Sequence, residues 1–322
     1  MTISESEVLL RELHVKYLSS LDKDASGKKT MSSFRAESIR MGGVYWALSS
    51  LLLLKIPIPS EKIESISKFI ESCFDESEGG YGWSSGHDAH ITSTHYAVLV
   101  LTQLDIPMDS NRREKILNFV ASNQKTDGSF QCDKWGETDL RFALNAVSVL
   151  SLLDPSGWKT RINYSLLIEF VFSCRNFGDS GFGPNPDLES HAAYTFCAIG
   201  ALVISGESIP ESDRLAHWLC ERQTPSGGFN GRPEKAPDVC YSWWTLSTLE
   251  MLGKAHWIDR NKLAQFILRA QEPTNGGIAD RPECVPDVFH TIFGIAGLSL
   301  IDAQKFNLAP VDARYCIARP NV

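Results

Sequence analysis

Apolar stretches alternate with amphipathic ones along this chain at a regular spacing. Six stretches are apolar on most sides and rich in Ala, Leu and Ser: 41–54, 95–104, 141–153, 191–204, 240–252 and 290–301. A helix that is apolar nearly all round is buried, and stretches of this length without strict alternation are too long for typical strands. The pattern therefore predicts six buried helices.

A glycine-rich turn recurs between these stretches, with its middle residue at positions 80, 129, 181, 228 and 277. An amphipathic segment precedes each turn: 66–73, 116–123, 167–174, 215–222 and 263–271. Five turns at intervals of 47 to 52 residues indicate an internal repeat. We therefore predict one repetitive domain over residues 1–322, although length alone suggests about two domains.

The alternation also predicts how the helices are arranged. Consecutive elements usually lie side by side, so each amphipathic helix is expected to cover a buried one. Six inner and about six outer helices favour an all-α fold of the α-α barrel class, and an open solenoid is the alternative. About ten polar residues follow each turn before the next buried stretch, so the long loops are expected on one face, where a site would lie.

Composition and charge exclude several classes of function. Lys and Arg total 31 against 39 for Asp and Glu, giving a net charge of −8. A chain this acidic is a poor candidate for broad nucleic-acid binding, which needs a basic face, or for coating an anionic membrane. No stretch approaches the ~20 apolar residues of a spanning helix, and no basic segment followed by an apolar one marks a secretion signal. With only 8 cysteines, a reduced cytoplasmic protein is expected.

The repeat register brings three metal-binding residue types together. Aligning the last two turns places Cys240 and His290 at the starts of neighbouring buried helices, with Asp238 two residues before Cys240. Carboxylate, thiolate and imidazole form a mixed ligand set that suits zinc, and three protein ligands leave a fourth position open. The alternatives are that Asp238 caps a helix, that Cys240 is a small buried residue and that His290 is a hydrogen-bonded core histidine.

Basic residues are expected at the same ends of the buried helices. They are His90, Arg141, His191, Arg232 and Lys235, and Tyr241 begins a buried helix beside them. Arg and Lys suit phosphate oxygens, so this group is a candidate anion site. The alternative is solvated loop charge offset by Glu234 and Asp238.

The buried helices also carry aromatic residues and glycines. Tyr45, Trp46, Phe142, Trp243 and Trp244 are aromatic, and Gly42 and Gly43 would leave room beside them. Glycine in a helix costs ~1 kcal/mol relative to Ala, so two adjacent glycines need a structural explanation. A long apolar ligand between the helices would supply one, and ordinary core packing is the alternative.

Three stretches of the sequence resemble the β subunits of protein prenyltransferases. They are 227–244, 276–291 and 40–46, which read GGFNGRPEKAPDVCYSWW, GGIADRPECVPDVFHT and RMGGVYW. Within this family they resemble most the type II enzymes, the Rab geranylgeranyltransferases. The resemblance covers residues 10 to 303 and implies an α-α barrel.

The resemblance implies a chemistry for each set of residues. Zinc would be bound by Asp238, Cys240 and His290, and the diphosphate of geranylgeranyl diphosphate by His191, Arg232, Lys235 and Tyr241. The isoprenoid would lie against Gly42, Tyr45, Arg141, Leu144 and Trp244, where Gly42 and Leu144 replace bulky aromatics of farnesyl-specific relatives and so favour the C20 lipid. The reaction implied is transfer of geranylgeranyl to C-terminal cysteine thiols of Rab GTPases through a zinc-bound thiolate. The partners implied are an α subunit and a Rab escort protein.

The role of Asp280 and three alternative functions of the chain also have to be considered. Asp280 aligns with an acidic residue proposed to help bind Mg²⁺ in farnesyl relatives, but a loop ion pair with Arg281 is the interpretation that we favour. The rivals are the β subunit of a CaaX prenyltransferase, either farnesyl or type I geranylgeranyl, a non-catalytic repeat scaffold, and a terpene cyclase. A cyclase would need an acid motif such as DxDD, which the sequence lacks.

Overall fold

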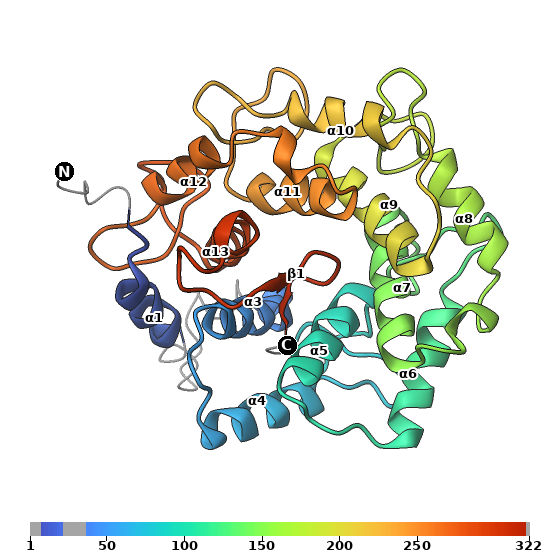
Figure 1. The fold of residues 1–322 in the computed structure, drawn as a ribbon. Coiled ribbons are helices and arrows are strands. Elements are labelled where there is room, and N and C mark those ends of the chain that lie inside the picture. The colour runs from blue at the N-terminus through green and yellow to red at the C-terminus, as the bar shows by residue number, and fades with distance from the viewer. Residues whose placement is uncertain (1–7, 22–36, 320–322) are drawn as a thin grey trace, which may run out of the picture. The chain divides into compact units, whose positions relative to one another are not determined.

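The computed structural model describes residues 8–21 and 37–319, and nearly all of its regular structure is helical (Figure 1). The six predicted buried helices are confirmed as α3 (Arg40–Leu53), α5 (Ile91–Gln103), α7 (Leu140–Leu153), α9 (Ala192–Ser205), α11 (Tyr241–Met251) and α13 (Val288–Asp302). The predicted amphipathic segments lie in α4 (Ser60–Ser72), α6 (Ser110–Ser122), α8 (Tyr164–Ser173), α10 (Ser212–Cys220) and α12 (Arg260–Arg269). We call these five the covering helices.

Smaller elements were not predicted. They are α1 (Arg11–Ser20), the 3-10 turns η3 (Glu37–Ile39), η4 (Trp158–Thr160) and η5 (Ala255–Trp257), and a short hairpin of β1 (Val311–Asp312) and β2 (Ile317–Ala318). The helix α1 escaped prediction because it carries only two buried residues, His14 and Leu18, and so shows a weak apolar face.

The described residues form two compact units. Unit 1 contains 8–21, 46–58 and 212–319, and unit 2 contains 37–45 and 59–211. In unit 1, α11 packs against α13, and in unit 2, α7 packs against both α5 and α9. The buried helices therefore pair as sequence neighbours within each unit.

A hydrogen-bonding side chain recurs ten residues after the middle of each glycine turn, one to three residues before the first residue of α5, α7, α9, α11 and α13. There a side chain accepts a hydrogen bond from a backbone N–H just beyond it: His90 from Thr92, Asp139 from Arg141, His191 from Ala193, Asp238 from Cys240 and Asp287 from His290. Such caps satisfy N–H groups that have no partner inside the helix. The cap at His90 also explains why α5 begins at Ile91, four residues before the predicted start.

Four of the five glycine turns pack directly on the backbone of another helix. Gly79, Gly128, Gly227 and Gly276 have φ between +80° and +95°, a conformation that side chains disfavour. A Cβ on them would lie 2.0 to 2.9 Å from the carbonyl oxygens of Lys115, Leu166, Lys262 and Leu13 respectively. The turn therefore needs glycine for its conformation and for its contact. In the third turn Ser180 adopts the same conformation, with φ of +65°.

The last of these contacts defines the role of α1. Gly276 packs against Leu13, and the backbone N–H of Gly277 donates to Nδ1 of His14 at 3.0 Å. Nε2 of the buried His14 lies 2.8 Å from Oε1 of Gln271. The N-terminal helix thus covers the fifth turn as α6, α8 and α12 cover theirs, so α1 is the sixth covering helix.

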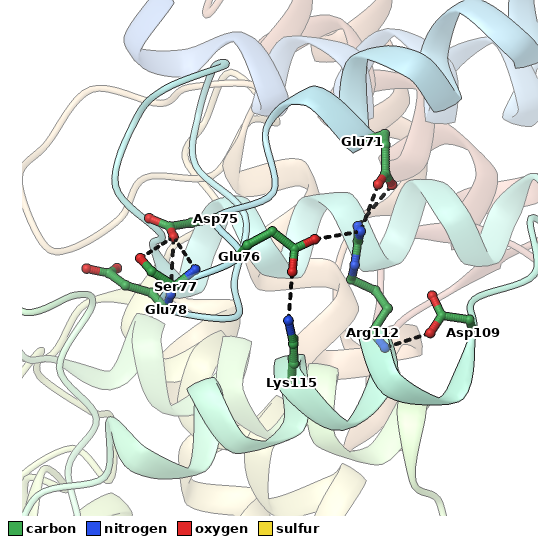
Figure 2. Close-up of polar contacts among 8 residues, drawn as sticks. All are labelled: Glu71, Asp75, Glu76, Ser77, Glu78, Asp109, Arg112 and Lys115. Carbon is green, nitrogen blue, oxygen red and sulfur yellow. Dashed lines mark hydrogen bonds and ion pairs between the residues drawn. The ribbon is translucent and has the colours of Figure 1, made fainter.

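Ion pairs fasten the first turn to the helix that follows it (Figure 2). Arg112 of α6 lies 2.7 Å from Glu71 and 3.2 Å from Glu76, and Lys115 lies 2.7 Å from Glu76. In the turn, the Asp75 carboxylate accepts hydrogen bonds from the backbone N–H groups of Ser77 and Glu78. These ion pairs give several of the charged residues a structural role that involves no ligand.

The loops after the turns bind to the starts of preceding buried helices. Backbone N–H groups of Met41, Ile91, Leu140 and Val239 donate to the carbonyls of Trp83, Cys132, Pro184 and Asp280, respectively. In each unit, the long loops therefore gather at the N-terminal ends of the buried helices, as predicted.

Two further expectations can be compared with the structure. All eight cysteines are free thiols, as expected for a chain without a disulfide framework. None of the described helices has the length and apolarity that crossing a membrane requires.

Candidate functional site

The three predicted zinc ligands come together in unit 1. Their ligand atoms all lie within 4.8 Å of one another. Cys240 is the N-cap residue of α11, Asp238 precedes it, and His290 lies in the first turn of α13. The hydrogen bond from the Val239 N–H to the Asp280 carbonyl, at 2.7 Å, ties the segment before α11 to the loop before α13. Two helix starts and one loop contact thus position all three side chains.

Asp287 orients the histidine of this site. Its Oδ2 lies 2.6 Å from Nδ1 of His290, and Nε2 of the same ring lies 3.3 Å from Oδ1 of Asp238. Because Nδ1–H donates to the Asp287 carboxylate, the neutral ring presents its Nε2 lone pair toward Asp238. Metal-binding histidines commonly have such a carboxylate behind them. Asp287 was not among the predicted site residues, although the offset between the last two turns, from 228 to 277, also places it at the position equivalent to Asp238.

The protons in this group show what the donor set requires. Burial lowers the pKa of His290, but its hydrogen bonds to Asp238 and Asp287 outweigh burial and raise it to about 9. Burial and the neighbouring Asp238 raise the pKa of the Cys240 thiol well above its usual value. Metal binding competes with protons for such ligands. A divalent cation would take the place of the protons on Cys240 and His290 beside two carboxylates, so the donor set fits zinc.

Asp238 also accepts a hydrogen bond just before the start of α11, although Cys240 is the N-cap residue of that helix. The Oδ1 of Asp238 accepts the Cys240 N–H at 2.8 Å. A carboxylate has two oxygens and several lone pairs. This hydrogen bond and metal binding are therefore compatible, and the hydrogen bond fixes the orientation of the carboxylate.

A second group of the same residue types lies in unit 2 and differs in one respect. His90, Cys132 and Asp133 also have ligand atoms within 4.8 Å of one another. However, Nδ1 of His90 accepts the Thr92 N–H at 3.0 Å, so the neutral ring carries its proton on Nε2. Burial, followed by Asp133, raises the pKa of Cys132 to about 12. The neutral His90 ring therefore has a hydrogen-bond donor at Nε2, where the His290 ring has a lone pair. For this reason the second group does not match the first as a metal site.

In unit 1, Arg232, Lys235 and Tyr241 lie between the fourth turn and the start of α11. The Asn230 amide donates to the Lys235 carbonyl at 3.0 Å and holds this loop closed. Arg232 is half-buried and Lys235 is exposed. Burial and the nearby Cys240 and Asp238 raise the pKa of Tyr241, so its hydroxyl keeps its proton and can donate to an anion.

In unit 2, His191 and Arg141 lie at the starts of α9 and α7. Nδ1 of His191 accepts the Ala193 N–H at 3.2 Å, so Nε2–H is a donor even in the neutral ring. The Arg141 guanidinium pairs with Asp139 at 2.6 Å and with Glu137 at 2.9 Å, which offsets its charge. The predicted diphosphate residues thus fall into two sets on separate units, and their joint action stays a prediction.

The residues predicted to contact the isoprenoid are mostly buried. In unit 2, Gly42 is buried, Tyr45 stacks on Tyr96 with ring centroids 4.8 Å apart, and Leu144 is 5% exposed. In unit 1, Trp244 packs against Phe293 with ring centroids 4.4 Å apart. Their role in lipid binding stays a prediction.

Asp280 forms the ion pair that we favoured. Its carboxylate lies 2.8 Å from the Arg281 guanidinium. Binding of Mg²⁺ there would have to compete with this pair.

A hollow of about 320 Å³ lies at the surface of unit 2 between the first turn and α6. Glu76, Glu78, Gly79, Lys115 and Phe119 are among its lining residues. None of the predicted site residues lines it, and Glu76 and Lys115 already pair with each other. It is therefore no candidate for the predicted site.

Comparisons with known proteins support the fold and identify the family. Residues 9–317 match the family model described as the prenyltransferase alpha-alpha toroid domain. The chain is 43% identical to the geranylgeranyl transferase type-2 subunit beta of Saccharomyces cerevisiae, over 98% of this chain and 96% of that protein. It is 30% identical to the protein farnesyltransferase subunit beta of Schizosaccharomyces pombe, over 92% of this chain and 79% of that protein.

A solved structure agrees in fold. It is the Candida albicans protein geranylgeranyltransferase-I complexed with GGPP, which superposes with a TM-score of 0.85 at 24% identity, over 97% of this chain and 96% of that chain. The helical repeat, the family match and the relatives agree with one another. The chain belongs to the prenyltransferase α-α toroid family, and among these relatives it is most similar to the type-2 geranylgeranyltransferase β subunit.

Proposed function

We propose that this chain is the catalytic β subunit of a type II geranylgeranyltransferase, which transfers geranylgeranyl from its diphosphate to C-terminal cysteine thiols of Rab GTPases. The observation that carries the chemistry is the Asp238–Cys240–His290 group with Asp287 behind the imidazole. The type of enzyme is supported by the identity of 43% to a type-2 β subunit against 30% to a farnesyltransferase β subunit.

In this proposal Asp238, Cys240 and His290 hold zinc. Zinc bound there would lower the pKa of the incoming cysteine thiol and so favour the nucleophilic thiolate. Asp287 keeps the His290 lone pair directed at the metal position, and the hydrogen bond from the Cys240 N–H keeps the Asp238 carboxylate in place.

Donors of this chain bind the leaving group. Arg232 and Lys235 carry positive charge, and the Tyr241 hydroxyl and the His191 Nε2–H donate hydrogen bonds. Such donors stabilise the negative charge that grows on the diphosphate as the C1–O bond breaks. Arg141, Tyr45, Gly42, Leu144 and Trp244 border the isoprenoid.

The partners follow from the same proposal. A β subunit of this type acts with an α subunit, and an escort protein presents the Rab substrate. The Asp280 carboxylate is paired with Arg281 in this proposal, so Mg²⁺ that bound there would have to displace this pair.

The test is prenyl transfer by this chain together with its α subunit. We expect geranylgeranyl transfer to Rab presented with its escort protein and little transfer to a CaaX peptide. Efficient modification of the peptide alone would instead support a CaaX enzyme. Absence of transfer to either acceptor by a zinc-loaded heterodimer would favour a non-catalytic scaffold.

Replacing Asp287 by asparagine should weaken zinc binding by roughly 10- to 100-fold, because ligand-orienting carboxylates contribute about that much. The Asn side chain keeps a helix-capping oxygen, so folding is expected to survive. Zinc affinity measured by competition with a chelator checks this, with Asp280→Asn as the matched control on the same loop. Equal affinity in both variants would contradict the orienting role.

Replacing Gly42 by tryptophan should shift preference from geranylgeranyl toward farnesyl diphosphate, because the added indole would occupy space at this buried position of α3. A competition assay with both lipids measures the shift. Unchanged use of both lipids would refute the argument that missing volume selects the longer chain.

A further inference from the structure

Gly200 lies in the middle of the buried helix α9, where glycine is less favourable than alanine. It lies within Ala192–Ser205, in a stretch otherwise made of apolar helix-compatible residues. Glycine there costs ~1 kcal/mol relative to alanine. Its φ does not lie in the left-handed range, so backbone conformation does not require glycine at this position.

One side chain explains the missing Cβ. A Cβ on Gly200 would lie 2.9 Å from Cδ1, 3.5 Å from Cδ2 and 3.9 Å from Cγ of Leu144. The three nearest atoms therefore all belong to Leu144 of α7, and the closest is the end of a flexible chain. Gly200 lets the Leu144 side chain pack against the α9 backbone.

Both residues are buried, and Leu144 keeps a solvent exposure of only 5%. On α7, Arg141 is exposed, and Leu144 and Asn145 retain 5% and 8% of their exposure. The neighbouring side chains of Ala143, Ala146 and Val147 are fully buried. On α9, Tyr194 and Cys197 retain some solvent exposure. Gly200 comes about one turn after Cys197 on the same side of the helix. Leu144 is thus a buried apolar side chain, and the missing Cβ of Gly200 sets how closely it packs on α9.

We propose that Gly200 is a specificity-determining residue for prenyl chain length, acting through the position of Leu144. The inference rests on the proposed function, which places the isoprenoid against Leu144. A methyl group at position 200 would push Leu144 off α9 and toward the isoprenoid that the proposed function places against it. The available length would shorten, and the C20 lipid would lose more than the C15 lipid.

The experiment compares wild type with Gly200→Ala, each as the complex with the α subunit, in competition between geranylgeranyl and farnesyl diphosphate. We expect the geranylgeranyl preference to fall about tenfold, the scale for one methyl group in an apolar pocket. Direct binding of a fluorescent prenyl diphosphate gives a readout independent of turnover. The melting temperature should stay equal or rise, because alanine is the better helix former.

The matched control is the same substitution in a Leu144→Ala background. There Gly200→Ala should leave the lipid preference unchanged, because the side chain that it displaces is gone. An unchanged preference in the single variant, an equal shift in the Leu144→Ala background, or loss of folding would each overturn the inference, the last because it would show that Leu144 cannot give way. A wild-type complex that transfers no geranylgeranyl would instead refute the proposed function.

Discussion

Replacing Cys240 by alanine should abolish zinc retention and lower prenyl transfer by roughly a thousandfold or more, because metal activation of a nucleophile contributes several kcal/mol. In the proposed site Cys240 supplies the thiolate ligand, and Asp238 and His290 alone would form an incomplete site. Binding of geranylgeranyl diphosphate should largely survive, since the proposed phosphate donors are other side chains. Elemental analysis, a transfer assay and a lipid-binding assay measure the three quantities.

Cys132→Ala is the matched control for this prediction. Cys132 is also buried and belongs to the second His, Cys and Asp group. Because His90 carries its proton on Nε2, we expect this variant to keep its zinc and its activity. If Cys240→Ala retained full activity without zinc, the metal would have no part in the reaction. If Cys132→Ala lost zinc, the distinction between the two groups would be wrong.

Replacing Gly227 by alanine should destabilise the fold by about 3 kcal/mol or more. The residue has φ of +95°, and its new Cβ would lie 2.3 Å from the Lys262 carbonyl oxygen. Strained backbone positions cost about 1 to 3 kcal/mol each, and the clash with main-chain atoms adds to this because a backbone cannot rotate away as a side chain can. Chemical denaturation measures the free energy of unfolding.

Gly206→Ala separates the two costs. Gly206 also has a left-handed φ, +73°, but a Cβ there would meet nothing within 4 Å. It should cost only about 1 to 2 kcal/mol, the price of the conformation alone. Equal losses in the two variants would show that the contact with the next helix does not explain the repeated glycine.

Much of the fold follows from patterns along the chain. The buried helices are predicted from their apolar residues because burial on all sides leaves a direct mark on composition, and five of the six start within two residues of the predicted position. The helix α1 could not be predicted, because its contacts are with Gln271 and Gly277, more than 250 residues away. No local pattern carries such a pairing.

The candidate site, like the fold, was predictable from the sequence only in part. Asp238, Cys240 and His290 could be proposed from the repeat register because equivalent positions in neighbouring repeats start neighbouring helices. The register also selects His90, which the structure distinguishes from His290 through the proton on its ring. Spacing gives the position of a histidine but not the partner of each nitrogen.

The sequence by itself determined the repeat, the six buried helices, the family and the three candidate ligands, since each depends on residue type and spacing. Only the tertiary structure decided that Asp287 orients His290, that the N-terminal helix covers the last turn and that Gly200 makes room for Leu144. The physical reason is that hydrogen bonds and van der Waals contacts depend on distances of a few tenths of an ångström between atoms far apart in sequence. Those distances exist only once the helices have packed.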